Sequence, residues 1–330
     1  MPKQAKNPQV SILIPVYNGA DVVSKAIDSA LEQTYQNIEI VIVNDGSTDN
    51  TERVLRRYQE QHPEKIKVVS QKNKGLGATR NALINMATGD YIIHLDADDW
   101  LKKDYVEKML HAIGDGDLAI CGYECYDSNY QPCGGRVPGP GSFAKYNFCS
   151  TAGKIWRREF IESNHLRYEP ISIGEDAYFN GVAYSKTNAI STIPYGGYCN
   201  YLNNNSMTHQ AVYDESMSFY SVINKLVCKL QGSPILCDPE FQFFVLKSLL
   251  VDIYLYKASL SARELIRIYR KNMHWYRDFL RQNNTKLRVR FQRGTTAMIN
   301  LTVNGFIIST KLHLDWIVLR ILKKIPVNML

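Results

Sequence analysis

Along roughly the first 120 residues, short apolar runs alternate with segments in which apolar residues recur at helical spacing. We predict strands over 10–17, 38–45, 65–71 and 90–95, and helices over 20–33, 47–61 and 76–87. Short, wholly apolar strands are typical of sheets that are covered on both faces, and their alternation with helices favours parallel pairing. The pattern therefore predicts an α/β domain with a mainly parallel sheet between two layers of helices.

The rest of the chain is patterned less regularly. Residues 121–150 are rich in Gly and Pro, so we expect a loop there, and its part 130–142 is either a lid or a simple surface loop. Short strands and helices resume after residue 151, and beyond residue 212 the pattern becomes helical. We therefore expect an α/β domain over 1–211 and a helical region over 212–330. No window of about 20 residues is both free of charges and predominantly apolar, so no transmembrane helix is predicted.

The formal net charge of +7 is divided unequally between these regions. Residues 257–330 hold 15 Lys and Arg against only Glu264, Asp278 and Asp315, whereas the remainder of the chain is net acidic. In 316–325, apolar and basic residues gather on different sides of a predicted helix, which is typical of segments on an anionic membrane surface. The alternative is a packed helical subdomain whose charges are solvated. Nucleic acid is not an expected partner.

A polar cluster follows each of the four predicted strands. These clusters are YN, NDGS, QKNKG and DADD, in chain order. Ligands of parallel α/β sheets bind beyond the carboxyl ends of the strands. We therefore expect one binding site along this edge of the sheet.

The fourth cluster contains Asp96, Asp98 and Asp99. Carboxylates this close repel one another at the end of a buried strand unless a cation neutralises them. Mg²⁺ and Mn²⁺ prefer oxygen ligands and are commonly held by one or two carboxylates together with phosphate oxygens. We predict a divalent-cation site at Asp96 and Asp98, whereas Asp99 either joins it or caps the following helix.

Other polar residues allow two interpretations each. Asp45 can accept a hydrogen bond from a ring N–H such as that of uracil, or belong to an ordinary turn. The glycine Gly75 beside Arg80 suits close approach to a phosphate, although a GxG pattern by itself is weak. Glu175 and Asp176 either favour a helix N-terminus or, beside a metal site, supply a general base.

Four segments, in this order and at these intervals, closely resemble the family 2 glycosyltransferases, which have the GT-A fold. They are VSILIPVYNGA, IEIVIVNDGSTDNT, NKGLGATRNALINMATGDYIIHLDADDW and GEDAYF. The resemblance covers about residues 8–210, and GKIWRREFIE is also similar to a segment of these enzymes. It implies a Rossmann-like GT-A catalytic domain with a nucleotide-binding part at 8–120 and an acceptor part at 121–211.

Position by position, the resemblance also implies roles for individual residues. It assigns the nucleotide pocket to Pro15, Tyr17 and Asn18, the base to Asp45, the ribose and diphosphate to Asn73, Gly75 and Arg80, and the DxD metal motif to Asp96 and Asp98. Asp98 is the expected direct metal ligand. Asp176 matches the catalytic base, and Glu175 stands beside it.

One segment departs from the family. Many relatives have an arginine after the base, where YCNYLNNNSMTH has Leu202, and His209 is only a weak substitute. The resemblance therefore does not imply contacts between this segment and the diphosphate.

The implied reaction transfers a sugar from a nucleoside-diphosphate sugar, with UDP favoured, to an acceptor hydroxyl with inversion, assisted by Mn²⁺ or Mg²⁺. The expected acceptor is a glycan or a lipid-linked glycan, in cell-surface or exopolysaccharide synthesis. Seven scattered cysteines without a CxxC pair fit a cytoplasmic protein, which we expect at the inner face of the cytoplasmic membrane, with possible contact through the basic C-terminus. The alternative is a non-catalytic module that binds sugar nucleotides or glycans, but the presence of Asp98 and Asp176 favours the enzyme.

Overall fold

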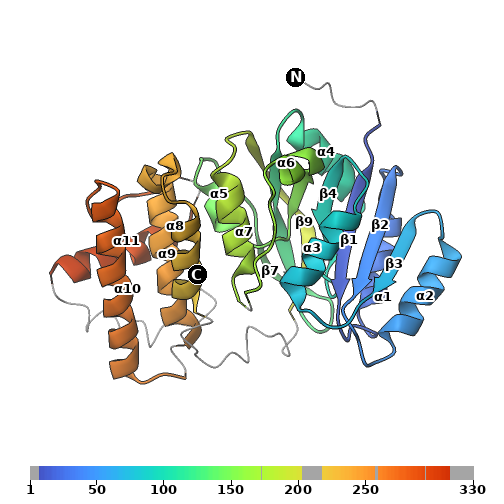
Figure 1. Ribbon diagram of the computed structural model, residues 1–330, viewed down its shortest axis with the longest axis horizontal. Coiled ribbons are helices and arrows are strands. Elements are labelled where there is room, and N and C mark those ends of the chain that lie inside the picture. The colour runs from blue at the N-terminus through green and yellow to red at the C-terminus, as the bar shows by residue number, and fades with distance from the viewer. Residues whose placement is uncertain (1–6, 172, 203–217, 257–258, 294, 313–330) are drawn as a thin grey trace. The chain divides into compact units, whose positions relative to one another are not determined.

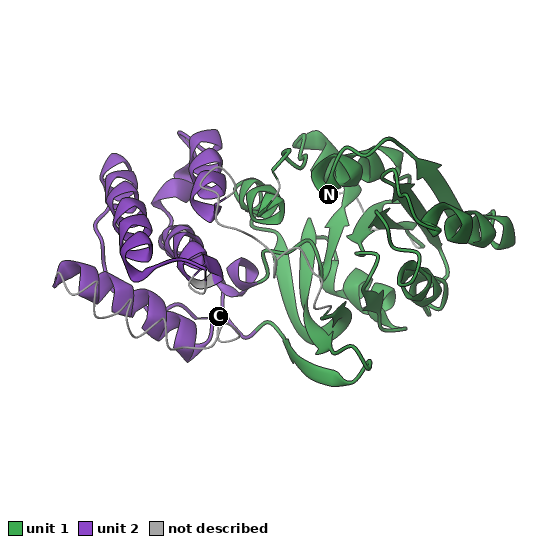
Figure 2. Cartoon of the chain, turned by 90° about the horizontal axis from the view of Figure 1, so that it is seen from below, with its two compact units in different colours: residues 1–138, 148–204 green, residues 139–147, 205–330 purple. Residues whose placement is uncertain are grey.

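The computed structural model describes residues 7–171, 173–202, 218–256, 259–293 and 295–312. The chain forms two compact units, which Figure 2 distinguishes by colour. The first unit contains residues 1–138 and 148–204, and the second contains residues 139–147 and 205–330. A short segment from within the expected α/β domain, 139–147, thus belongs to the second unit.

The first unit is built on a nine-stranded sheet. The strands β1 (Val10–Val16), β2 (Ile38–Asn44), β3 (Ile66–Ser70) and β4 (Tyr91–His94) pair in parallel in the order β3-β2-β1-β4. The register places Val16 opposite Asn44 and Leu13 opposite His94, so the carboxyl ends of these strands lie along one edge. The predicted strands and their parallel pairing are confirmed.

Three helices connect these strands: α1 (Val23–Leu31), α2 (Thr51–Gln61) and α3 (Leu76–Met86) (Figure 1). The chain runs from β1 to β3 in one direction and returns through α3 to β4, so right-handed connections place α3 on the face opposite to α1 and α2. Ile27 of α1 and Leu83 of α3 are both fully buried. The predicted helical layers on both faces are confirmed.

The second half of the sheet is mixed. It contains β5 (Trp100–Leu101), β6 (Leu118–Tyr126), β7 (Pro132–Arg136), β8 (Lys154–Arg157) and β9 (Ile190–Tyr201). The β6 strand pairs in parallel with β9, whereas β4 with β8, β8 with β6, β6 with β7 and β5 with β9 are antiparallel. The helices α4 (Tyr105–Ile113), α6 (Arg158–Ser163) and α7 (Glu175–Tyr184) also belong to this unit.

The expectation of a loop over 121–150 is wrong in part. Residues 121–126 continue β6, residues 132–136 form its antiparallel partner β7, and 144–147 form the short helix α5 (Ala144–Asn147). Glycine allows the two strands of this hairpin to pair closely, because a Cβ atom on Gly135 would lie 2.6 Å from the carbonyl oxygen of Tyr123. The Gly-rich composition therefore indicates close strand pairing there.

The second unit is helical. It contains α5, α8 (Phe219–Lys229), the 3₁₀ helix η3 (Pro234–Cys237), α9 (Pro239–Tyr256), α10 (Ala262–Gln282) and α11 (Ala297–Lys311). The central α9 contacts α8, α10 and α11, and a capping box of Ser261 and Glu264 begins α10. The expected helical C-terminal region is confirmed, although the amphipathic segment 316–325 lies outside the described residues. Within the described ranges, no helix has the length and apolar character that a membrane span requires.

Candidate active site

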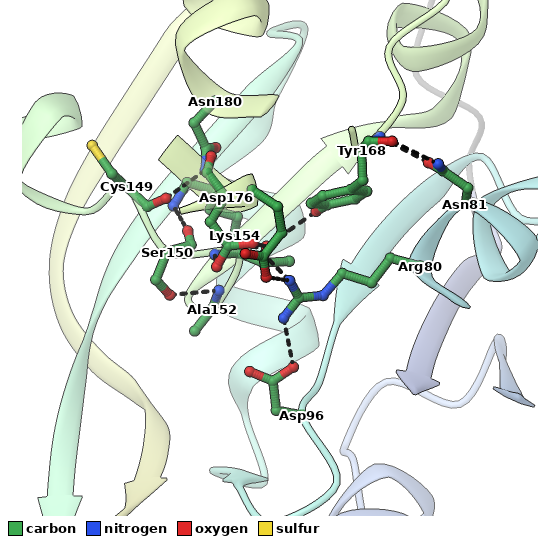
Figure 3. A network of polar contacts seen from close by, with 12 residues as sticks. Arg80, Asn81, Asp96, Cys149, Ser150, Ala152, Lys154, Tyr168, Asp176 and Asn180 are labelled. Atoms are coloured by element: carbon green, nitrogen blue, oxygen red, sulfur yellow. Dashed lines mark hydrogen bonds and ion pairs between the residues drawn. The ribbon is translucent and has the colours of Figure 1, made fainter. Parts of the chain in front are cut away.

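Arg80 lies at the centre of a cluster of three carboxylates (Figure 3). Its Nη1 donates to Glu175 Oε1 at 2.9 Å and to Asp176 Oδ1 at 2.7 Å. Its Nη2 donates to Asp96 Oδ1 at 3.0 Å. The arginine comes from α3, the two adjacent acids begin α7, and Asp96 follows β4. A single side chain thus joins the DxD motif to the predicted catalytic base.

The guanidinium of Arg80 is buried, with only 2% of the residue exposed. Burial of a cation is costly unless carboxylates and hydrogen bonds compensate for the lost hydration. The three carboxylates do so, and the ring of Tyr168 adds a cation–π contact at 5.4 Å from the guanidinium carbon. The cluster still has three acidic groups for one cation, so it retains an excess of negative charge.

The carboxylate of Asp176 is held by a loop before β8. The Thr151 N–H donates to Asp176 Oδ2 at 2.9 Å, and the Thr151 hydroxyl donates to Oδ1. Beneath this loop, the buried Lys154 ammonium donates to the carbonyls of Phe148 and Ser150. Burial lowers the pKa of Lys154 to about 8. The loop thereby fixes the orientation of the predicted base.

The adjacent Glu175 is in a different environment. Burial raises its pKa to about 7, and the neighbouring charge of Asp176 adds to the shift. Asp176 accepts hydrogen bonds on both of its oxygens from Arg80 and Thr151, whereas Glu175 accepts from the Arg80 side chain through Oε1. Of these two acids, Asp176 is therefore the one that the surroundings prepare to act as a carboxylate.

The turn after β4 contains the other two aspartates. Burial raises the pKa of Asp98, with a further contribution from Asp96, and within the described ranges no other residue donates a hydrogen bond to its side chain. Asp99 is 2% exposed and accepts from the Tyr201 N–H at 2.8 Å, so it binds the end of β9. It does not cap the next helix, since α4 begins after Asp104. Burial, followed by the charges of Asp96 and Asp98, raises the pKa of Asp99 to about 8.

The carboxylates of this turn are of the type that can bind a divalent cation. Asp98 is half-buried, its charge is disfavoured by its surroundings, and in the described part of the chain only its own backbone N–H donates to its carboxylate. The described residues contain no group of three or more His, Cys, Asp or Glu arranged as a complete metal site. One or two carboxylates are nonetheless the usual protein contribution where phosphate oxygens complete the coordination shell.

Asp45 is buried at the end of β2 and organises the loop that follows β3. Its Oδ1 accepts from Gln71 Nε2 at 2.7 Å and from the Lys74 N–H at 2.9 Å, and its Oδ2 accepts from the Gly75 N–H at 2.9 Å. Gly75 has a positive φ of 83°, a conformation that glycine adopts without strain. Asp45 therefore sets the shape of the loop that carries Asn73 and Gly75, and Asn73 itself is exposed.

The residues after β1 line the same edge. Pro15 lies within the buried strand, whereas Tyr17 is 53% exposed just beyond it. Asn18 has a positive φ of 49°, and its Oδ1 accepts from the Thr48 N–H at 2.8 Å, so the turns after β1 and β2 are joined. Polar groups from neighbouring strands thus gather at one edge of the sheet, as the alternating pattern predicts.

The sequence analysis did not identify Thr151, Tyr168 or Lys154. The Tyr168 hydroxyl lies 3.1 Å from Thr151 Oγ1, and its backbone is bonded to Asn81 of α3. Only Lys154 leaves a signal in the sequence, because a lysine in a short buried strand requires a polar partner.

Residues 11–155 match the sequence model described as Glycosyl transferase family 2. This part of the chain belongs to that family. Glycosyltransferase GlyA of Streptococcus pneumoniae is 30% identical over 197 residues, which cover 53% of this chain but only 28% of GlyA. The chain thus spans about a quarter of the length of this curated relative.

Two solved structures share the fold of this family 2 domain and its helical extension. S. aureus TarS 1-349 in complex with UDP superposes with a TM-score of 0.66 at 16% identity, covering 96% of this chain and 90% of the TarS 1-349 chain. The mannosyltransferase PcManGT from Pyrobaculum calidifontis, in complex with GDP-Man and Mn²⁺, superposes with a TM-score of 0.57 at 16% identity, covering 96% and 89%. At these identities the likeness concerns the fold alone, which confirms the predicted GT-A class.

Proposed function

We propose that this protein transfers a sugar from a nucleoside-diphosphate sugar to an acceptor hydroxyl with inversion at the anomeric carbon. One observation carries the proposal: the Arg80 guanidinium binds both Asp96 of the DxD motif and Asp176 on α7. Asp96, which would help to orient the diphosphate, and Asp176, which would accept a proton, are thereby held by the same side chain. A single displacement needs a base and a leaving-group site in the same active site, and the shared contact with Arg80 supports such a site.

In this mechanism Asp176 removes the proton from the attacking hydroxyl. General bases contribute roughly 10²- to 10⁴-fold to the rate. Arg80 and Thr151 hold its carboxylate in place, so little reorganisation accompanies the proton transfer. With one base and one displacement, an α-linked donor gives a β-linked product.

Asp98, supported by Asp96, would hold the divalent cation, for which we propose Mn²⁺ or Mg²⁺. Such a cation, when bound, neutralises charge on the diphosphate leaving group. The support is the Asp98 carboxylate itself, whose raised pKa indicates that its charge lacks compensation within the described chain. PcManGT, which has the same fold, is described in complex with Mn²⁺.

For the donor, we propose a UDP-sugar bound along the edge formed by Pro15, Tyr17, Asn18 and the loop of Asn73 and Gly75. We also propose that Asp45 contacts the base. Its carboxylate accepts from the N–H groups of Lys74 and Gly75, so it would bind the base and hold the neighbouring loop at the same time. The structure of TarS with UDP supports a uridine nucleotide on this fold.

For the acceptor, we propose a glycan or lipid-linked glycan in polysaccharide synthesis at the inner face of the cytoplasmic membrane. The second unit supports a peripheral contact with anionic lipid. The exposed apolar residues Met298, Leu301 and Ile308 of α11 share one face with Leu312, which caps the end of this helix. Exposed basic residues such as Arg288 and Lys311 belong to the same unit, a composition suited to an anionic lipid surface.

The test is a screen of UDP-, GDP- and dTDP-sugars with Mn²⁺ or Mg²⁺, with donor hydrolysis and transfer to glycan acceptors as readouts. We expect turnover of a UDP-sugar that requires the metal, and an inverted product by NMR. A retained anomeric configuration would overturn the displacement scheme. Tight donor binding without any hydrolysis or transfer would instead indicate a non-catalytic binding module.

A further inference from the structure

A pocket of the first unit lies beside the DxD turn, between α1, β5 and the tip of the β6–β7 hairpin. It has a volume of about 670 Å³ and is lined in part by Lys25, Trp100, Tyr126 and Tyr130. This volume lies within the range of about 300–1,000 Å³ that is typical of ligand sites. We infer that this pocket binds a neutral sugar residue of the acceptor glycan, an inference that rests on the proposed glycosyl transfer.

Aromatic rings form one wall of the pocket. The ring of Trp100 lies 4.7 Å from that of Tyr126 and 5.8 Å from that of Tyr130, measured between centroids. Tyr130 in turn stacks on Tyr201 at 5.2 Å with an interplanar angle of 19°, and it is 45% exposed. The Lys25 ammonium lies over one face of Trp100 and of Tyr130, and Tyr201 stacks on Tyr130, so these two rings hold the ammonium at the pocket. A pyranose ring in the pocket would contact the ring edges and Tyr126, and its hydroxyls would meet the ammonium.

Polar groups around the wall match the hydroxyls of a sugar. The Lys25 ammonium lies 3.4 Å from the centroid of Trp100 and 3.5 Å from that of Tyr130, and no carboxylate partner is found for it in the described part of the chain. Asp21, at the rim, likewise has no hydrogen-bond donor among the described residues. The ammonium, held by two rings, can still donate N–H groups, and Asp21 can accept, which suits a group that both donates and accepts, as a sugar hydroxyl does.

The charge balance of the pocket favours a neutral ligand. Its lining contains the lysines Lys25, Lys102 and Lys103 and the acids Asp21, Asp28 and Glu32. Lys103 pairs with Glu32 at 3.2 Å, and Lys102 pairs with Glu124 just outside the pocket. A strongly anionic ligand would meet as many carboxylates as ammonium groups, so net attraction is small.

The position of the pocket connects it to the proposed reaction. Trp100 follows Asp98 by two positions, and Asp21 follows Gly19, whose Cβ position would be 3.9 Å from Ala97 Cβ in the DxD turn. The start of α1 therefore lies against that turn. The lining of the pocket contains neither Asp176 nor Arg80, so the pocket would hold a sugar residue of the acceptor other than the one that reacts.

Tyr130 allows a clean test because it is exposed at a hairpin tip and has a positive φ of 57°. Asn tolerates this conformation, so Tyr130→Asn removes the ring without straining the turn, and Tyr130→Phe keeps the ring as the matched control. The full-length wild type is first screened on an array of neutral and acidic oligosaccharides. The strongest neutral binder is then titrated against all three proteins by calorimetry.

We expect binding to weaken by about tenfold or more in Tyr130→Asn and to stay within about threefold in Tyr130→Phe. In the transfer assay, the acceptor KM should rise in Tyr130→Asn, whereas metal-dependent donor hydrolysis should be unchanged. Equal glycan affinity in the Asn variant and the wild type, binding of acidic oligosaccharides only, or no glycan binding by the wild type would overturn the inference. If the wild type binds glycan through Tyr130 but never turns over a donor, the pocket assignment stands and the proposed transferase activity fails.

Discussion

The Arg80 cluster and the turn that contains Asp98 and Asp99 are both acidic, but their negative charges are compensated differently. In the cluster, Asp96, Glu175 and Asp176 share one buried guanidinium. In the turn, Asp98 and Asp99 have no cationic partner in the described part of the chain, and burial raises the pKa of both. The difference indicates that the fold preorganises the cluster by itself, whereas we propose that a positively charged ligand completes the turn.

The largest expected effect is on the proposed base of the cluster. Asp176→Asn removes the proton acceptor while keeping a similar shape, so kcat should fall by about 10²- to 10⁴-fold. The donor Kd, measured by calorimetry, should change little. Glu175→Gln is the matched control and should retain much more activity, because Asp176 is the acid that Thr151 orients. Unchanged transfer by Asp176→Asn would refute the assignment of the base.

The second effect concerns the cation that holds the cluster together. Arg80→Met leaves three neighbouring carboxylates without their buried partner, so the free energy of unfolding should fall by about 3–5 kcal/mol. Urea denaturation measures this change. The matched control is Arg56→Met, since Arg56 forms an exposed ion pair with Glu52 and its loss should cost less than about 1 kcal/mol. Similar losses in both variants would show that the cluster is not preorganised.

The third effect is a pH dependence within the cluster. Burial raises the folded-state pKa of Glu175 from an ordinary value of 4.5 to about 7, so the protonated form is favoured by folding. Its contribution to stability is therefore fully present below pH 4.5 and is lost as the pH rises through 7. The unfolding free energy of the wild type relative to Glu175→Gln should decrease by about 3 kcal/mol across this window. Parallel stability curves for the two proteins between pH 5 and pH 8 would contradict the assignment.

The smallest effect tests the turn. A cation at about 100 times its Kd should stabilise the wild type by about 2.7 kcal/mol, and Asp98→Asn should lose most of this gain. Thermal unfolding with and without Mn²⁺ and a nucleoside diphosphate measures it. Asp115→Asn, which changes an exposed aspartate after α4, is the control and should respond as the wild type does. Equal metal-induced shifts in Tm for Asp98→Asn and the wild type would contradict the proposal that the turn, unlike the cluster, is completed by a bound cation.

Local patterns predicted most of the first half of the fold. The spacing of apolar residues was enough to predict β1 to β4 and α1 to α3. These elements follow one another in the sequence and bury their apolar residues against their sequence neighbours. The hairpin of β6 and β7 was missed because glycines mark both flexible loops and closely packed strands. The difference depends on what lies opposite them, such as the Tyr123 carbonyl beside Gly135.

The sequence by itself determined the acidic and polar residues at the strand ends, since parallel strands bring their carboxyl ends to one edge of the sheet. It did not determine their partners. The contact between Arg80 and Asp176 joins residues 96 positions apart, and the support of Asp176 by Thr151 depends on how the loop before β8 folds over Lys154. Tertiary structure alone decided these pairings, because the burial and the approach of distant charges that set them arise only when the helices pack on the sheet.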